Sequence, residues 1–468
     1  MNQQQEAQQQ SSSLILEQIG ALLNSRKFRE LREVLTSAPL ADVAEVLSQF
    51  APEQQAAMFR ILPKDIAADI FEYLDLEHQT ALLNALGDSR VAVILDSMDP
   101  DDRTALLEEI PAAAAQQLLK LLSAPERQVA LSLLGFPEHS VGRLMNPHYL
   151  AVRENLTVQQ VLDHIRQHGK ETDLINVIFV LDERGKLLSD LRIRDILLAP
   201  ADRPVGELIK RRAISLLATE DQEQAVEVFK KYDRNALPVV SSNQVMMGVV
   251  TVDDVLDVAE EEATEDIQKL GGVEALEEAY ITTPFGRLVH KRAKWLVILF
   301  IGELLTASAM AFYEDKIRQA VILALFIPLI ISSGGNSGSQ AATLIIRALS
   351  VGEIQLRDWW RVLRREAGAG LVLGILLGLF GFARVAVWSK VTQVYGPDWI
   401  LVAITVSLAL LLIVMWGIIA GAMLPFVLKR LGADPATSST PFVATLVDVT
   451  GLVIYFSVAT WVLRGVIL

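Results

Sequence analysis

The C-terminal part of the chain consists of long apolar stretches separated by short polar segments. Each stretch holds about 20 predominantly apolar residues, which as a helix is enough to cross the hydrocarbon core of a bilayer. The pattern therefore predicts an all-α transmembrane domain over residues 291–468. We place its five spans at approximately 294–313, 317–346, 367–389, 399–428 and 441–463.

The N-terminal part shows a different periodicity. Apolar residues recur there at three- and four-residue spacing in short runs, which is typical of amphipathic helices. Two such runs fit between successive helix breakers, so residues 14–138 are predicted to form an all-α superhelix of stacked helix pairs. The Gln- and Ser-rich residues 1–13 are expected to be a disordered tail. The breakers stand 24 residues apart, at Pro39, Pro63, Gly87, Pro111 and Gly135.

A second repeat occupies residues 139–258. Two β-branched stretches, 176–181 and 235–240, lie 59 residues apart, and each leads through a turn and a second strand to a helix that begins with an acidic residue. The repeat predicts an α/β pair of domains, and its layout resembles a tandem pair of CBS domains. In many families such pairs bind adenine nucleotides such as ATP.

The resemblance to CBS domains implies a nucleotide role for two residues of the second copy. Thr251 and Asp254 would sit where the motif contacts phosphate and ribose. The first copy departs from this pattern, because Ser189 stands where the second copy has Gly248, and Arg192 stands where it has Thr251.

The densest charge of the chain follows the second copy. Eleven acidic residues and one base, Lys269, lie between residues 253 and 278, among apolar residues at helical spacing, which predicts an acidic connecting helix over 259–290. A run of like charge is usually a solvated face. Carboxylates without His or Cys are also the ligands that Mg²⁺ and Ca²⁺ prefer, and we favour bound divalent cations. The candidate ligands are Asp253, Asp254, Asp257, Glu261, Glu262, Glu265 and Asp266.

Net charge separates the two halves of the chain. Residues 1–292 hold 29 Lys and Arg against 47 Asp and Glu, a net charge of −18, whereas residues 293–468 hold 13 against 9, a net charge of +4. An acidic soluble half is a poor partner for nucleic acid. The chain has no cysteine, which excludes thiolate metal sites. Basic residues precede the first span and fill the segment 347–366, so the soluble half is expected in the cytoplasm and the C-terminus outside the cell membrane.

The second span contains an unusual run of small and polar residues, 332–340. Small residues in a membrane helix often only allow close helix packing. Asn336 beside the pair Gly334 and Gly335 suggests more, namely a loosened backbone whose polar groups face a cavity, because irregular backbone at that depth must be shielded from lipid. We favour this second interpretation.

Two carboxylates lie inside the predicted spans, Glu303 in the first and Asp448 in the fifth. An acid near the centre of a bilayer costs about 2.5–3.5 kcal/mol, so it normally faces a pathway or a partner. Asp448 lies between Thr445 and Thr450, which is a plausible setting for a hydrated cation. Glu303 stays unassigned, since a protonated carboxyl bonded to another helix explains it equally well.

The order of the parts and the motifs of the spans together resemble the MgtE family of magnesium channels. The resemblance covers nearly the whole chain after residue 13. The motifs that carry it are Phe326-Ile-Pro328, Gly334-Gly335-Asn336-Ser337-Gly338-Ser339-Gln340, Arg347 with Gly352-Glu353, and Pro441 with Asp448-Val-Thr-Gly451 and Tyr455-Phe456.

This resemblance implies a homodimer in the lipid bilayer that conducts Mg²⁺ into the cytoplasm and is not an enzyme. Spans two and five would line the pore, with Asp448 binding hydrated Mg²⁺ and Asn336 beside it. The acidic connecting helix would act as a plug, closed when cytosolic Mg²⁺ bridges it to residues such as Asp99 and Asp102. The alternatives are a less selective transporter that passes Co²⁺ or Mn²⁺, and a membrane-anchored CBS sensor of nucleotides or cations.

Overall fold

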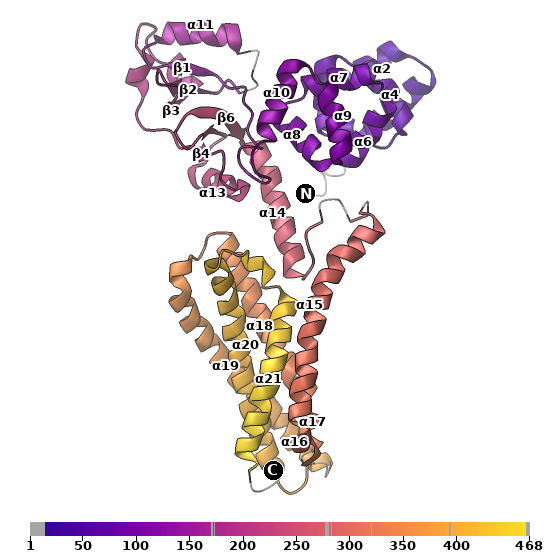
Figure 1. The fold of residues 1–468 in the computed structure, drawn as a ribbon, viewed down its shortest axis with the longest axis vertical. Coiled ribbons are helices and arrows are strands. Elements are labelled where there is room, and N and C mark those ends of the chain that lie inside the picture. The colour runs from indigo at the N-terminus through magenta and orange to yellow at the C-terminus, as the bar shows by residue number, and fades with distance from the viewer. Residues whose placement is uncertain are drawn as a thin grey trace. The chain divides into compact units, whose positions relative to one another are not determined.

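The computed structural model describes residues 15–169, 172, 174–276, 280–281, 283–319, 321–392 and 395–464. These residues form two compact units, one up to Glu260 and one from Glu261 onward (Figure 1). The tail expected at 1–13 lies outside the described residues, as do Glu277 and Glu278 of the acidic segment.

The first unit begins with short helices of nearly constant length. Residues 15–24 are helical, and the nine helices that follow begin at intervals of 12 residues, from Phe28 to Ala124. The predicted 24-residue unit is therefore a pair of helices, and the helical domain is confirmed. The helices are α2 (Phe28–Ser37), α3 (Leu40–Leu47), α4 (Pro52–Phe59), α5 (Lys64–Glu72), α6 (Leu76–Ala85), α7 (Asp88–Ser97), α8 (Pro100–Glu109), α9 (Ala112–Leu121) and α10 (Ala124–Leu133).

In three successive pairs, a buried polar side chain of the second helix binds a carbonyl of the first helix. Gln55 donates to the carbonyl of Leu47 at 3.0 Å, and 24 residues later Gln79 donates to Phe71 at 3.0 Å. Arg103, again 24 residues on, donates to Leu95 at 2.9 Å and pairs with Glu126. Each of these side chains satisfies a carbonyl at the end of a helix, which has no partner within its own helix.

Two small sheets form the rest of the first unit. In each sheet the first strand pairs parallel with the second, and the second pairs antiparallel with the third. The two copies meet at their hairpins, where Met246 N–H donates to Gly185 O at 3.1 Å, so the α/β pair is confirmed. The elements are β1 (Ala151–Arg153), α11 (Val158–His168), β2 (Val177–Leu181), β3 (Leu187–Arg192) and α12 (Ile193–Leu197), then β4 (Leu216–Leu217), α13 (Gln222–Tyr232), β5 (Ala236–Val240) and β6 (Met246–Thr251).

The acidic helix α14 (Val252–Leu270) begins directly after β6. It starts earlier than the predicted connecting segment and ends well before residue 290. Residues 271–276 and 283–284 are not helical, and the next helix begins at Phe285.

Five helices of the second unit are long and apolar enough to cross a membrane, as predicted. The first begins nine residues earlier than expected, and the third extends beyond both of its predicted ends. The α-helices that begin in this unit are α15 (Phe285–Phe312), α16 (Glu314–Gln319), α17 (Val321–Ala324), α18 (Ile327–Ser350), α19 (Trp359–Val391), α20 (Trp399–Arg430) and α21 (Thr440–Val462). Helices α17 and α18 together form the second span, and the short α16 is not a span.

Helices α18, α20 and α21 pack against one another, while α19 covers α20 and α15 runs along α21 (Figure 1). Span two is interrupted at Leu325 and Phe326, between α17 and α18. Tyr455 of α21 is fully buried, and its hydroxyl donates to the carbonyl of Leu323 at 2.9 Å. This hydrogen bond satisfies a backbone group at the interruption, as the lipid environment requires.

Candidate metal sites

Asp448 lies in the third turn of α21, which begins at the N-cap Ser439 with Pro441 in its first turn. Its carboxylate faces the bare backbone of α18, because a Cβ added at Gly335 would lie 3.5 Å from Asp448 Oδ1. It also interacts electrostatically with Glu303 of α15. The structure therefore places a half-buried carboxylate where α15, α18 and α21 approach one another.

The hydroxyl groups around Asp448 bond mainly within their own helix. Thr445 donates to Pro441 O at 3.0 Å, and Thr450 donates to Leu446 O at 2.8 Å. Thr450 also accepts a hydrogen bond from Trp416 Nε1 of α20 at 2.8 Å. These bonds leave the carboxylate of Asp448 as the charged group at this level of the helix.

The prediction of a loosened backbone at 332–340 is wrong. Helix α18 is continuous through that run, and the interruption of span two lies upstream at residues 325–326. The glycines serve close packing, since a Cβ at Gly338 would lie 2.9 Å from Gly417 O of α20, and one at Gly417 would lie 2.5 Å from Gly334 O. Asn336 is exposed on α18, and its amide donates to Ser332 Oγ at 3.3 Å.

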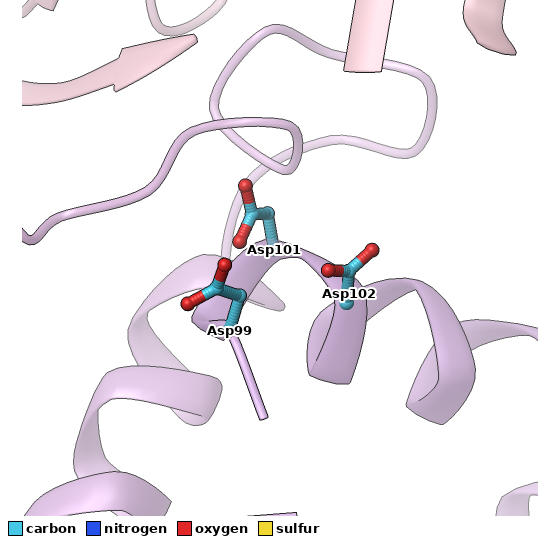
Figure 2. A group of neighbouring side chains, drawn as sticks. All are labelled: Asp99, Asp101 and Asp102. Atoms are coloured by element: carbon cyan, nitrogen blue, oxygen red, sulfur yellow. The ribbon is translucent and has the colours of Figure 1, made fainter. Parts of the chain in front are cut away.

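A cluster of carboxylates lies at the start of α8. Asp99 is the N-cap of this helix, and Asp101 and Asp102 lie in its first turn. Carboxylate oxygens of all three lie within 4.8 Å of one another. Figure 2 shows the three side chains. Asn146, from the segment before β1, donates to Asp101 Oδ1 at 3.4 Å. Three carboxylates this close together form an all-oxygen donor set of the kind that Mg²⁺ prefers.

Two further carboxylates belong to the same region. Glu72, at the end of α5, accepts a hydrogen bond from Asp99 N–H at 2.9 Å. Asp254, in the first turn of α14, accepts one from Thr251 Oγ1 at 2.5 Å and one from Thr251 N–H at 3.2 Å. Asp254 also repels Asp101 and Asp102.

The pKa values of the carboxylates in this region are raised, because the groups are buried close to one another and repel each other. Burial, followed by repulsion from Asp102, raises the pKa of Glu72 to about 8. Burial and then repulsion from Asp254 raise the pKa of Asp102 to about 7 and hold that of Asp101 well above its usual range. Burial raises the pKa of Asp254 to about 6, against the lowering effect of the hydrogen bonds from Thr251. A bound cation would relieve this repulsion as a proton does.

The other predicted ligands of α14 differ in their surroundings. Asp253 and Asp257 are exposed and add to the negative field at Asp102. Glu261 and Glu262 follow one turn later, and each interacts with other groups of the protein.

Near the end of α14, the predicted ligands have protein partners. Glu265 pairs with Lys269, whose amine also donates to Asp434 Oδ2 at 2.7 Å. Asp266 forms a hydrogen bond with Ser350 at the end of α18. These contacts tie the end of the acidic helix to the segment before α21 and to the end of α18.

A basic cavity of about 370 Å³ lies beside β3 of the first α/β copy, and Arg234 of the second copy is also part of its wall. Asp190 and Arg234 form a buried ion pair at 2.9 Å on its wall. Among the described residues, Arg234 Nη2 and Asp190 Oδ1 are buried without a further hydrogen-bond partner. The cavity is lined by Ser189, Asp190, Leu191, Arg192, Arg194, Asp195, Leu208, Lys210, Arg211 and Arg234.

Comparison with known proteins agrees with this architecture. The model of the MgtE family, described as a divalent cation transporter, matches residues 327–458, and that of the MgtE intracellular N domain matches 38–139. The CBS model matches 141–202 and 205–261. The chain is 40% identical over 441 residues to the magnesium transporter MgtE of Thermus thermophilus, covering 94% of this chain and 96% of that protein. The chain belongs to the MgtE family.

Other MgtE proteins agree with this assignment. The magnesium transporter MgtE of Bacillus subtilis is 30% identical, covering 94% of this chain and 95% of that protein. A crystal structure of the cytosolic domain of the Mg²⁺ channel MgtE in complex with ATP is 32% identical, with a TM-score of 0.50, and covers 52% of this chain and 99% of that one. The soluble part of a magnesium transporter shares the fold, at 22% identity and a TM-score of 0.52, covering 54% of this chain and 99% of that one.

The MgtE assignment confirms the family and fold class predicted from the sequence, whereas the individual ligands stay predictions. The structure brings Asp99 and Asp102 together with Asp254, but it also adds Asp101 and Glu72, which sequence reasoning missed. Asp101 stands in the sequence between the predicted ligands Asp99 and Asp102, so its place in the cluster could have been predicted. Glu72 lies 27 residues before Asp99 in the sequence, and only the repeat geometry brings them together.

The nucleotide contacts predicted at Thr251 and Asp254 stay a prediction. Thr251 and Asp254 are hydrogen-bonded to each other, and Asp254 lies in the acidic cluster. The basic cavity instead contains the first-copy counterparts Ser189, Arg192 and Asp195, the copy that departs from the motif.

Proposed function

We propose that this chain conducts Mg²⁺ across the cell membrane into the cytoplasm and that Asp448 binds the ion during passage. The observation that carries the proposal is the carboxylate of Asp448, held between membrane helices against the bare backbone at Gly335. A charge at that depth is costly unless it serves a pathway or a partner. Two relatives that are named magnesium transporters, each matching 94% of this chain, support this function.

The chemistry of Mg²⁺ suits a site with few protein ligands. The ion gives up its water reluctantly and requires nearly octahedral geometry. A carboxylate that binds the hydrated ion through its water molecules attracts it without the cost of full dehydration. Such binding is weak enough to permit release, as conduction requires. A homodimer with its two-fold axis along the pore would present two copies of Asp448.

Cytosolic Mg²⁺ would close this pathway through the acidic region. Glu72, Asp99, Asp101, Asp102 and Asp254 repel one another, and bound Mg²⁺ would stabilise their close arrangement. Shifting a two-state gate from 1:99 to 99:1 requires about 5.5 kcal/mol of differential binding, which several weak sites together can supply. The result is negative feedback on cytosolic Mg²⁺.

The end of the acidic helix provides a physical link to the pore helices. Lys269 bonds to Asp434, shortly before α21 begins, and Asp266 bonds to Ser350 at the end of α18. Movement of this end of α14 would therefore act directly on the two helices that meet at Gly335 and Asp448.

The basic cavity of the first CBS copy would bind an adenine nucleotide such as ATP. Its arginines and Lys210 can hold phosphate groups, and the unpartnered Arg234 Nη2 is a buried donor on its wall. A related cytosolic domain was crystallised with ATP. Replacing Lys210 with Ala is expected to weaken ATP binding about tenfold, because one phosphate charge loses its partner. Lys230→Ala, on α13, is the control, and equal loss in both variants would contradict this location.

The proposed orientation follows from charge. Four arginines follow the C-terminal end of α18, one just before α19 and three in its first two turns: Arg357, Arg361, Arg364 and Arg365. The end of the helix bundle that holds the connection between α18 and α19 is therefore expected on the cytoplasmic side. The soluble N-terminal part then lies in the cytoplasm and the C-terminus outside.

Reconstitution of the purified protein into liposomes that contain a Mg²⁺-sensitive dye tests the function. We expect Mg²⁺ entry that Co²⁺ or Mn²⁺ inhibits only weakly. Equal permeation of all three ions would favour the less selective transporter. An absence of any ion flux, together with nucleotide or cation binding, would contradict transport and favour the CBS sensor.

A further inference from the structure

Glu303 has no role in the function proposed so far, although it lies in the middle of α15 at the depth of the membrane. Its side chain is exposed on the protomer, and α15 packs mainly against α21. A carboxylate that faced lipid would be strongly unfavourable, so Glu303 requires water, a partner or a cation beside it.

The register of the two helices places Glu303 beside Asp448. Helices α15 and α21 run parallel, because Trp295 donates to Ser439 Oγ at 2.9 Å near one end and Tyr313 stacks on Phe456 at 4.8 Å near the other. Between these contacts, Gly302 packs against Thr445. Residues 303–306 of α15 therefore lie level with about 446–449 of α21, and the carboxylates of Glu303 and Asp448 interact electrostatically.

A buried hydroxyl completes this region. Thr306 follows Glu303 by one helical turn, and the register puts it level with Val449, the neighbour of Asp448. Thr306 is only 8% exposed, and Thr306 Oγ1 has no hydrogen-bond partner among the described residues. This is unusual here, because the hydroxyls of Ser308, Ser333, Thr405, Ser407, Thr445, Thr450 and Ser457 each donate to a carbonyl of their own helix.

Two carboxylates and a free hydroxyl at the same depth can together supply oxygen ligands to one cation. The two negative charges repel each other, and a divalent cation between them removes that repulsion and satisfies the oxygens at the same time. A monovalent cation compensates only half of the charge. The arrangement therefore discriminates between ions by their charge.

We propose that Glu303 is a second carboxylate of the ion pathway, which with Asp448 and Thr306 binds a hydrated divalent cation and favours it over monovalent cations. The proposal rests on the proposed function, because it assigns Glu303 to the same pathway as Asp448.

The test compares Glu303→Gln with wild type in liposomes, measuring Mg²⁺ entry against external Mg²⁺ concentration. One unit charge acting on a divalent ion through its water shell, at about 5 Å in a medium as polar as water, is worth about a factor of ten in affinity. The Mg²⁺ concentration for half-maximal entry is therefore expected to rise about tenfold. Block of Na⁺ current by Mg²⁺, recorded in planar bilayers, is expected to weaken by the same factor.

Control variants separate this role from a structural one. Ser308→Ala, on the same helix, is expected to leave both measurements unchanged, and Glu303→Asp, which keeps the charge, is expected to restore most of the affinity. Thr306→Val should raise the half-maximal concentration by a smaller factor of about three, since it removes one neutral ligand. Glu303→Gln and Asp448→Asn together should cost less than the product of their separate effects.

The possible failures can be told apart. Wild-type affinity and wild-type block in Glu303→Gln, with a reduced flux in Asp448→Asn, would overturn the role of Glu303 alone. Undiminished flux in Asp448→Asn would overturn the proposed function itself. If Glu303→Gln does not elute as folded protein, the comparison of Glu303→Asp with Thr306→Val decides, and an unchanged affinity in Thr306→Val would count against the shared site.

Discussion

Replacing Glu72 with Gln tests whether the acidic region stores electrostatic repulsion that cations relieve. The amide keeps an acceptor for Asp99 N–H, so the hydrogen bond at 2.9 Å can persist while the charge is lost. In the absence of Mg²⁺, the charged form of Glu72 is disfavoured by burial and by repulsion from Asp102. We therefore expect Glu72→Gln to stabilise the first unit at high pH.

The magnitude follows from the pKa of Glu72, which rises from its ordinary value of 4.5 to about 8. Because the unfolded chain releases this proton at lower pH than the folded one, stability falls as pH rises from about 4.5 to 8 and is constant above that range. A difference of one pH unit is worth about 1.4 kcal/mol, which gives close to 5 kcal/mol for full burial. Since Glu72 is only half-buried, solvent screening reduces the expected effect to about 2 kcal/mol.

Urea unfolding of residues 15–260, followed by circular dichroism, measures this effect. The segment forms one compact unit, and a related cytosolic domain was crystallised without its membrane part. In EDTA, Glu72→Gln should equal wild type near pH 5 and exceed it by about 2 kcal/mol near pH 8.5. Adding Mg²⁺ should stabilise wild type more than the variant, because cation binding to the folded state adds stability. Glu45→Gln, at an exposed position of α3, is the control.

A variant that is no more stable than wild type at pH 8.5 in EDTA would refute this reasoning. The same conclusion would follow if Mg²⁺ stabilised both proteins equally, since Glu72 would then have no part in the cation-sensitive cluster.

Three further changes test the packing. Gly421→Ala places a methyl group against the carbonyl oxygen of Gly338 and should destabilise the membrane domain by about 1–3 kcal/mol. Thermal unfolding in detergent measures this loss. Gly368→Ala is the control and should cost less, because its methyl group meets open space. Gln79→Leu removes one of the two hydrogen bonds to the carbonyl of Phe71, which keeps the bond from Leu74 N–H, and should destabilise the helical domain by about 1 kcal/mol in urea unfolding. Unchanged stability would contradict a contribution of this repeated bond. Tyr455→Phe removes the hydrogen bond to Leu323 and should cost about 1 kcal/mol by the same detergent assay, and a neutral result would mean that the interruption of span two needs no such support.

Periodic features of the fold could be predicted from the sequence. The breakers Pro39, Pro63, Gly87 and Pro111 are the N-caps of α3, α5, α7 and α9, because each ends one helix and permits the next to begin. The five spans and the two α/β repeats were equally accessible, since apolar length and alternation are local properties.

The glycine run of span two was misread because its meaning depends on a partner helix. A sequence does not show that Gly417 and Gly421 of α20 lie opposite Gly334 and Gly338, where backbone meets backbone. Small residues that allow close packing and small residues that loosen a helix have the same composition. The actual interruption, at Leu325 and Phe326 just before Pro328, had a local signal in that proline.

The candidate sites were only partly predictable for a similar reason. Asp448 was recognisable by the cost of a carboxylate in an apolar span, whereas its neighbours Glu303 and Gly335 come from two other helices. The contact between Asp101 and Asp254 joins residues more than 150 positions apart. Such contacts depend on tertiary structure and leave no periodic trace in the sequence.

Mg²⁺ entry through Asp448→Asn tests the central claim most directly. This variant keeps the size and polarity of the side chain and removes only its negative charge. Asp448→Glu is the matched variant that keeps the charge. With equal amounts of folded protein in dye-loaded liposomes, Asp448→Asn should lose most Mg²⁺ entry and Asp448→Glu should retain part of it. Mg²⁺ entry at the wild-type rate through Asp448→Asn would contradict the assignment of this carboxylate to the ion pathway.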